Sequence, residues 1–305
     1  MNVRISARIL IELMSIHNMY EKRKKYSFLP RGLTQKPIGN FAITVFVVTI
    51  LMCFMPSAKF PLRKIDKIKT IVLDAGHGGD DSGAPGIKGS REFLEKDITL
   101  DIVLRLGKML QEKMPDVKVL YTRKTDKSVK LWERPNYANR NEADLFISIH
   151  CNANDNSKAH GSETYFMGLH VNEGNLDVAK RENAVITYEA DYKENDRYGG
   201  FDPNSPESHI IFSLVQNAYM NQSLRLSSYV ESETSKISKI RSRGVKQAGF
   251  LVLWKTSMPS ILVETGFITN PEDRAYLASD EGKSSIVRGV FQAIENYKSF
   301  VEKGS

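Results

Sequence analysis

Short apolar runs alternate with longer amphipathic stretches along most of this chain. Residues 70–74, 117–122 and 145–150 are rich in Val, Ile and Leu, and each run has the length of a buried β-strand. Between the first two runs, apolar residues recur with the four-residue spacing of an amphipathic helix, at Ile98, Ile102, Leu106 and Leu110. This alternation predicts a layered α/β fold.

The same pattern continues toward the C-terminus. It predicts strands at 162–166, 250–253 and 260–264, and helices at 131–142, 210–235 and 282–300. Residues 169–206 break the rhythm because they are strongly polar and carry several turn-forming Gly and Pro residues. We expect this stretch to be an insertion, part helix and part loop. No second domain with its own core is evident after residue 58.

The N-terminus has a different character. Residues 41–55 are apolar and uncharged, follow a basic stretch, and end at Pro56, Ser57 and Ala58, as in a secretory signal peptide. The run is short of the ~20 residues that span a bilayer, although a tilted fit would make it an uncleaved anchor. We expect export to the periplasm or cell envelope, with membrane contact only through this segment. Met19 is an alternative start of the chain, and a buried core helix is the less favoured alternative for 41–55.

The predicted organisation changes how the charge is interpreted. We divide the 305 residues into a leader (1–58), a linker (59–69), a catalytic domain (70–300) with the insertion at 169–206, and a tail (301–305). The net charge is +7, but the leader alone carries eight basic and two acidic residues. The remainder is nearly neutral and lacks a basic patch with interleaved aromatic residues, which argues against nucleic-acid binding. Cys151 is the only cysteine after the leader, so no disulfide can form within the mature chain.

Three polar residues stand where predicted strands end. His77 lies in the glycine-rich loop after 70–74, His150 closes 145–150, and Glu264 closes 260–264. Strand ends are where α/β sheets form ligand sites. Each residue alone has an ordinary structural explanation, but three at three strand ends make coincidence less plausible. The loop lacks the Gly-Lys-Ser/Thr of a phosphate-binding loop, so a P-loop is excluded.

Two histidines and a carboxylate would suit zinc, which in hydrolytic sites takes three protein ligands and leaves one position open. Glu95 begins the helix with the apolar stripe, where a packed element would hold its carboxylate in place. Glu92 competes, three residues earlier in the chain. Spacing alone does not choose between these two glutamates.

Several segments, in this order, resemble zinc-dependent N-acetylmuramoyl-L-alanine amidases of the amidase-3 type. They include IVLDAGHGGDDSGAPG, EKDITLDIVLRLGKML, LFISIHCNA, GSETYF and MPSILVETGFITNPED, and the resemblance covers about residues 70–298. It implies a single α/β domain with a mixed twisted β-sheet flanked by helices. It also implies hydrolysis of the amide between N-acetylmuramic acid and L-alanine in peptidoglycan, in cell-wall remodelling or daughter-cell separation.

The resemblance also assigns site residues. The metal ligands of the family fall on His77, Glu95 and His150 around one Zn²⁺ ion, and its catalytic glutamate falls on Glu264. Glu92 stays as an alternative ligand, because this chain has extra residues before the EKD segment and Arg91 before Glu92 imitates the usual arrangement. Glu163, in GSETYF, either lines the substrate cleft or is structural.

Some alternatives remain open at this point. Related amidases imply that the 169–206 insertion can cover the zinc site until an activator protein displaces it, and a wall of the substrate groove is the alternative. A zinc peptidase that cuts stem or cross-link peptides is the second candidate activity. A non-catalytic wall-binding module would require the loss of a ligand or of the base, and neither is lost.

Overall fold

The computed structural model describes residues 63–170, 172–189, 192, 196–213 and 218–304, which belong to one compact unit spanning Pro61–Ser305. The predicted leader, including the apolar segment 41–55, lies outside the described residues. Within the described part of the chain, no helix has the length and apolar character needed to cross a membrane.

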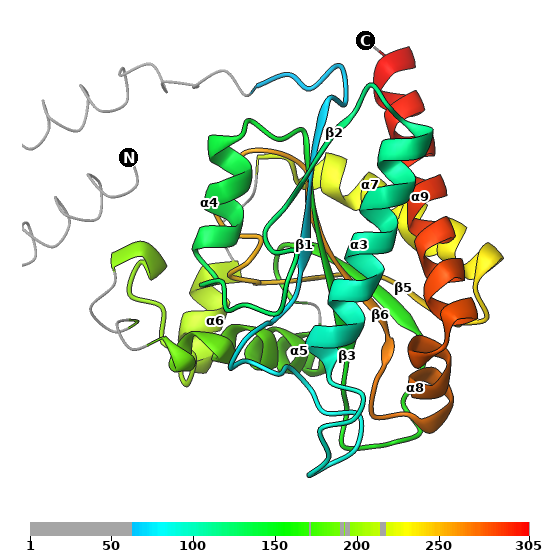
Figure 1. Ribbon diagram of the computed structural model, residues 1–305. Helices are drawn as coiled ribbons and strands as arrows, with labels where there is room; N and C mark the ends of the chain where they lie inside the picture. The colour runs from blue at the N-terminus through cyan, green and yellow to red at the C-terminus, as the bar shows by residue number, and fades with distance from the viewer. Residues whose placement is uncertain (1–62, 171, 190–191, 193–195, 214–217, 305) are drawn as a thin grey trace, which may run out of the picture. The chain divides into compact units, whose positions relative to one another are not determined.

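The described strands form one mixed sheet in the order β2-β1-β3-β6-β4-β5. β1 pairs in parallel with β2 and β3, β3 pairs in parallel with β6, and β4 joins β6 antiparallel and β5 in parallel. The mixed sheet flanked by helices is the architecture predicted from the sequence (Figure 1). The strands are β1 (Thr70–Ala75), β2 (Lys118–Tyr121), β3 (Leu145–Asn152), β4 (Ser162–Met167), β5 (Ser242–Ala248) and β6 (Ser260–Phe267).

Side chains that alternate along the central strands build a separate core on each face of the sheet. In β1, Ile71 and Leu73 pack with the helices α3 (Glu95–Lys113), α7 (Met220–Ile237) and α9 (Asp280–Lys303). Val72 belongs to the opposite core, which includes residues of α4 (Glu133–Arg140) and α5 (Glu173–Asn183). Both faces are therefore covered, as a sheet with buried parallel strands requires.

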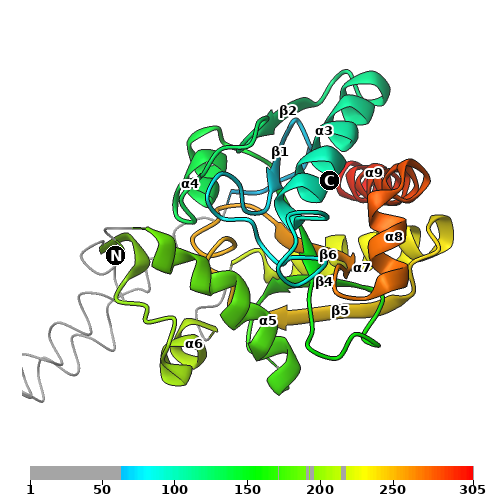
Figure 2. The ribbon, with the colours of Figure 1, turned by 60° about the horizontal axis from the view of Figure 1, so that its bottom comes forward.

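The insertion is partly helical, as the sequence indicates. It contains α5 and the 3₁₀ helices η1 (Ala184–Tyr188) and η2 (Asp196–Tyr198), and it ends where α6 (Pro206–Ser213) begins. Asn172 begins α5 by accepting a hydrogen bond from the Asn175 backbone N–H, and Val178 and Ala179 pack into the second core. Figure 1 shows α5 at the bottom of the domain, at the end where β1 and β3 finish, and Figure 2 views this end from below.

Two predicted elements are wrong, and a third is present with slightly longer bounds than predicted. Residues 250–253 form a turn, in which Leu253 N–H donates to Phe250 O, and the neighbouring strand is Ser242–Ala248. The predicted helix 210–235 is two helices, α6 and α7, and Ile210 and Ile211 of α6 are exposed, although the predicted helix places Ile211 on its apolar side. The helix predicted at 282–300 extends over Asp280–Lys303, and a separate helix, α8 (Pro271–Ala278), precedes it.

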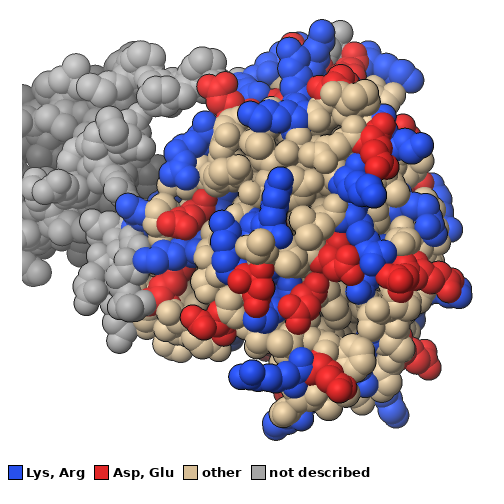
Figure 3. Space-filling view, viewed as in Figure 1, with Lys and Arg blue, Asp and Glu red and all other residues tan. Residues whose placement is uncertain are grey.

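Residues 63–69, expected to be a linker, pack along the domain. Ile68 is buried, and Arg63 pairs with Asp144 at the start of β3. Lysine and arginine side chains alternate with acidic ones over the face in Figure 3. This mixed pattern agrees with the small net charge of the chain beyond the leader.

Candidate metal centre

His77 is held in an unusual backbone conformation directly after β1. Its φ of 59° lies in the left-handed region, which L-residues rarely adopt. Two buried arginines fix this loop: Arg134 Nη2 donates to His77 O at 2.9 Å, and Arg123 Nη2 donates to Gly76 O at 2.7 Å. His77 Nδ1 lies 2.8 Å from Asp81 Oδ2, which leaves Nε2 to face the centre of the site.

Two loop glycines are required by the close approach of the site residues. A Cβ on Gly83 would lie 2.6 Å from His77 Cδ2 and 2.7 Å from Glu95 Oε2. A Cβ on Gly76 would lie 2.5 Å from the His150 ring. Any larger residue at either position would displace these side chains.

Glu95 is fixed from both sides at the N-terminus of α3. Its Oε1 accepts from the Cys151 backbone N–H at 2.9 Å, and its Oε2 accepts from the Ala84 backbone N–H at 2.8 Å. The side chain is fully buried. Glu92, the alternative, lies in the preceding loop and is exposed. The structure therefore brings Glu95 into the site and leaves Glu92 outside it.

Sheet register places His150 and Glu264 side by side. β3 and β6 are parallel neighbours, and His150 pairs with Glu264. β4 is antiparallel to β6, so Glu163 near its start pairs with Glu264 from the other side. The ends of parallel strands converge at one edge of the sheet, and His77, His150 and Glu264 all lie there, as predicted.

A fourth side chain that the sequence analysis did not identify completes the cluster. Glu182, near the end of α5, joins His77, Glu95 and His150, and one ligand atom from each lies within 4.8 Å of the others. His77 Nε2 is 3.0 Å from Glu95 Oε1 and 3.4 Å from Glu182 Oε2. His150 Nδ1 is 3.2 Å and 3.0 Å from the same two oxygens. All four residues are buried.

The geometry fits a metal ion. His77 Nε2, His150 Nδ1 and Glu182 Oε2 are buried but make no hydrogen bond within the described part of the chain, despite their short separations. Such buried polar atoms normally have a partner. The four ligand atoms lie close enough together to bind one ion, and two imidazoles with carboxylates are a donor set that zinc prefers. The cluster can therefore hold one metal ion.

The pKa values show how strongly this cluster favours positive charge. Burial lowers the pKa of His150, but the Glu182 carboxylate outweighs it and raises that pKa to about 9. Burial raises the pKa of Glu95, but His77 outweighs it and lowers that pKa to about 2. Without a metal, protons on the imidazoles balance the carboxylates, and a bound cation would displace them.

Glu264 has a different environment. It is fully buried, and neither carboxylate oxygen has a hydrogen-bond partner among the described residues. Burial is the main cause that raises its pKa well above the ordinary value, and Glu182 adds to the rise. Arg181 and His150 oppose this rise, and Arg181 Nη2 lies 3.8 Å from Glu264 Oε1. A carboxyl group in such a place is suited to exchange a proton.

Glu163 is held by several donors rather than facing open space. Arg243 and Lys246 form ion pairs with it, and Tyr165 Oη donates to Oε2 at 2.6 Å. Asn152 Nδ2 also donates to Oε2, at 3.1 Å. Burial would raise the pKa of Glu163, but Lys246, Tyr165 and Arg243 together lower it. Glu163 therefore stays an ionised acceptor that anchors its neighbours.

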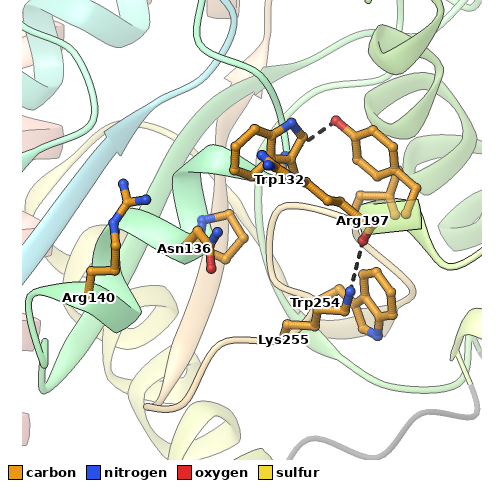
Figure 4. Close-up of a pocket in the computed structure, with 9 residues that line it drawn as sticks. Trp132, Asn136, Arg140, Arg197, Trp254 and Lys255 are labelled. Atoms are coloured by element: carbon orange, nitrogen blue, oxygen red, sulfur yellow. Dashed lines mark hydrogen bonds between the residues drawn. The ribbon is translucent and has the colours of Figure 1, made fainter. Parts of the chain in front are cut away.

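The insertion also packs on the core around a separate cavity of about 320 Å³ (Figure 4). The Arg197 guanidinium lies 3.7 Å from the centroid of the Trp132 ring, and Lys255 Nζ donates to Arg197 O at 2.8 Å. None of the residues that line the cavity belongs to the metal cluster. These contacts join η2 to α4 and to the turn after β5.

Comparison with known proteins shows which family the chain resembles. Residues 71–296 match the family model described as N-acetylmuramoyl-L-alanine amidase. The chain is 32% identical to the amidase AmiA of Escherichia coli K12 over 271 residues, 88% of this chain and 90% of that protein. It is 34% identical to AmiC of Escherichia coli O6:H1 over 234 residues, which cover 76% of this chain but only 53% of AmiC.

Solved structures give the same result. An amidase from Clostridium difficile 630 superposes with a TM-score of 0.56 at 26% identity, covering 76% of this chain and 97% of that one. AmiC2 of Nostoc punctiforme superposes with a TM-score of 0.54 at 30% identity, covering 75% and 96%. This chain belongs to the N-acetylmuramoyl-L-alanine amidase family. Its reaction is hydrolysis of the amide between N-acetylmuramic acid and the L-alanine of peptidoglycan.

The residues that the sequence analysis missed lie on the insertion. Arg181 and Glu182 sit in a polar stretch, AKREN, that resembles an ordinary solvated helix face. The only available signal was the position of the polar insertion between two strands of the sheet. No spacing rule connects Glu182 with His77, which precedes it by about a hundred residues.

Proposed function

We propose that this amidase is zinc-dependent and that His77, Glu95 and His150 hold the ion. The observation that carries the proposal is the convergence of buried nitrogen and oxygen atoms that make no hydrogen bonds with one another. When bound, zinc would lower the pKa of a water molecule and polarise the scissile carbonyl. Asp81 would orient His77. The backbone N–H groups of Cys151 and Ala84, which donate to the Glu95 carboxylate, would keep that carboxylate in place.

Glu264 is the proposed general base and acid. Its buried carboxylate would take one proton from the attacking water, whose oxygen bonds to the lactyl carbonyl carbon. It would then give that proton to the alanine nitrogen as the C–N bond breaks. The immediate products are a lactyl carboxylic acid on muramic acid and a peptide with a free L-alanine amine. The acid then loses the second water proton and the amine gains one, so the final products are a carboxylate and an ammonium group, and atoms and charges balance.

The fourth ligand suggests that the structure represents a closed state. A catalytic zinc site has three protein ligands and one open position, whereas a structural site has four. Glu182 supplies a fourth ligand from α5, so the inserted helix would occupy the position that water and substrate need. We infer that the insertion is a lid rather than a groove wall, and that an activator protein displaces it.

The proposed setting is outside the cytoplasm. The basic and apolar character of residues 1–58 supports export to the periplasm or cell envelope, and peptidoglycan, the substrate, lies there. The leader would either be cleaved after export or stay in the membrane as an anchor, and in both cases the catalytic domain would reach the cell wall. Cell-wall remodelling or daughter-cell separation is the corresponding role.

Metal analysis combined with product analysis tests the proposal. The purified protein should contain one zinc ion per chain, and its digests of peptidoglycan should contain a free lactyl carboxylate on muramic acid by mass spectrometry. Chelation should stop the release of peptide, and added zinc should restore it. A cut within the stem peptide instead would indicate the alternative zinc peptidase.

A further inference from the structure

The α5 residue next to Glu182 contacts the core through a different set of atoms. Arg181 Nη1 donates to Ala153 O at 2.7 Å, and Nη2 donates to Asn152 Oδ1 at 3.0 Å. Its Nε donates to Glu182 Oε1 at 3.1 Å. Arg181 therefore covers two acceptors just beyond His150, the metal ligand on β3.

These two acceptors are fixed by the core and not by α5. Asn152 is fully buried, and its Nδ2 donates to Glu163 Oε2, which Lys246 and Tyr165 hold in place. The Ala153 backbone N–H donates to Asn152 Oδ1 at 2.8 Å. A reversed Asn152 amide would set oxygen against oxygen at Glu163 and N–H against N–H at Arg181. The amide oxygen consequently stays directed toward the Arg181 guanidinium when α5 moves.

Withdrawal of α5 would remove the guanidinium donors from both acceptors and leave Asn152 Oδ1 with the Ala153 backbone N–H alone. A buried acceptor that loses a hydrogen-bond partner costs free energy, because it has also given up its hydrogen bonds to water. A new donor is therefore favoured at this position. The position of that donor is defined, because the same Arg181 Nη2 that bonds Asn152 lies 3.8 Å from Glu264 Oε1. A donor at this place would therefore adjoin the carboxylate that protonates the leaving nitrogen.

We propose that Asn152 Oδ1 and Ala153 O form an acceptor pair for the N–H groups at the L-alanine end of the stem peptide. This inference rests on the proposed function. Asn152 Oδ1 receives the N–H of the scissile amide, and Ala153 O receives the next N–H along the peptide. Arg181 occupies the place of these donors in the closed state, so α5 covers the leaving-group side with Arg181 and the metal side with Glu182. Glu163 acts as a positioning residue through Asn152.

A substrate without the scissile N–H tests the acceptor pair. The assay uses the zinc-loaded double variant Arg181→Ala and Glu182→Ala, in which α5 no longer covers the site. Two substrates are compared: a muramyl peptide and its ester analogue, in which oxygen replaces the scissile N–H. Adding Asn152→Ala should lower kcat/KM for the amide about tenfold more than for the ester, the effect of one lost hydrogen bond. A merely structural role would lower both values equally, and equal losses would overturn the proposal.

A second variant covers the case in which Asn152→Ala fails to fold. Glu163→Gln keeps the size of the side chain but replaces one of its two acceptor oxygens with an amide N–H₂ donor. Because Arg243 and Lys246 both bind Oε1, the remaining oxygen would face these cations, and the N–H₂ group would face the Asn152 amide nitrogen. This variant should lower the amide-to-ester ratio of kcat/KM in the same direction, and an unchanged ratio would contradict the proposal. Failure of the proposed function is visible earlier: a double variant that binds zinc but releases no lactyl carboxylate contradicts that function, and the acceptor pair with it.

Discussion

His150 Nδ1 and Glu182 Oε2 lie 3.0 Å apart, although His150 belongs to the central strand β3 and Glu182 to the inserted helix α5. The pair joins the inserted helix to a strand whose residues are all buried. Glu182 is buried, and Arg181 beside it forms hydrogen bonds to the same edge of the sheet. Release of α5 would thus uncover the metal position and the adjoining acceptors in one movement.

Removal of the Glu182 carboxylate should activate the enzyme. Glu182→Ala leaves three protein ligands and one open position, so we expect peptide release from peptidoglycan to rise at least about tenfold without an activator. The matched control is Glu173→Ala, an exposed glutamate in the first turn of the same helix, which should behave like the parent protein. Unchanged or reduced activity in Glu182→Ala would favour a groove wall over a lid.

Loss of the proposed base should separate chemistry from metal binding. Glu264→Gln preserves the size of the side chain but cannot take a proton, so kcat should fall by about 10²- to 10⁴-fold. The zinc content, measured by inductively coupled plasma mass spectrometry, should stay at one ion per chain. Full activity in this variant would exclude Glu264 as the general base.

The zinc content of two variants shows whether Glu95 or Glu92 is the metal ligand. Glu95→Gln removes a buried carboxylate from the cluster, so zinc content should fall well below one ion per chain. Glu92→Gln changes an exposed side chain in the loop and should bind zinc as the parent protein does. The reverse result would assign the ligand to Glu92.

The ion pair beneath the His77 loop should make stability depend on pH. Burial raises the pKa of Asp74, but Arg134, Ser148 and Thr122 outweigh it, so its pKa in the folded protein lies below the ordinary value. The carboxylate therefore stabilises the fold above about pH 4 and loses this effect as the pH falls through the lowered pKa. Asp74→Asn should lower the free energy of unfolding at pH 7 by about 3 kcal/mol.

Urea unfolding at several pH values measures this contribution. Below about pH 4, the parent protein should lose stability more steeply than Asp74→Asn as the pH falls, since the variant has no carboxylate to protonate at this position. Asp155→Asn, at an exposed position, should follow the parent curve. Parallel curves for the parent and Asp74→Asn would show that the pair contributes no pH dependence.

Much of the site could be predicted from sequence because its residues follow strands with a clear pattern. Residues 70–74, 145–150 and 260–264 are apolar runs, and parallel pairing brings their ends, with His77, His150 and Glu264, to one edge. β5 was missed because its sequence, SRGVKQA, is polar and only partly buried at the edge of the sheet. The prediction of a strand at 250–253 is wrong because a short apolar run indicates that residues are buried, not that they are extended. Here the buried residues form a turn.

Glu182 and Arg181 could not be predicted for a different reason. Their roles depend on how a polar helix packs against distant strands, and local sequence carries no signal for such contacts. Asn183, the next residue, shows how the helix is fixed: its side chain accepts from Leu251 N–H at 2.8 Å and donates to Gly249 O at 2.8 Å. The inserted helix α5 is thus held by the buried turn at 250–253 and the residue before it, where the sequence predicted a strand.

Anomalous diffraction at the zinc edge, from crystals of the zinc-loaded protein, tests the closed metal centre most directly. We expect one peak about 2.0–2.2 Å from His77 Nε2, His150 Nδ1 and carboxylate oxygens of both Glu95 and Glu182. A peak bound by the first three residues with Glu182 turned away would contradict closure by α5. The absence of any peak at these four residues would contradict the metal centre itself.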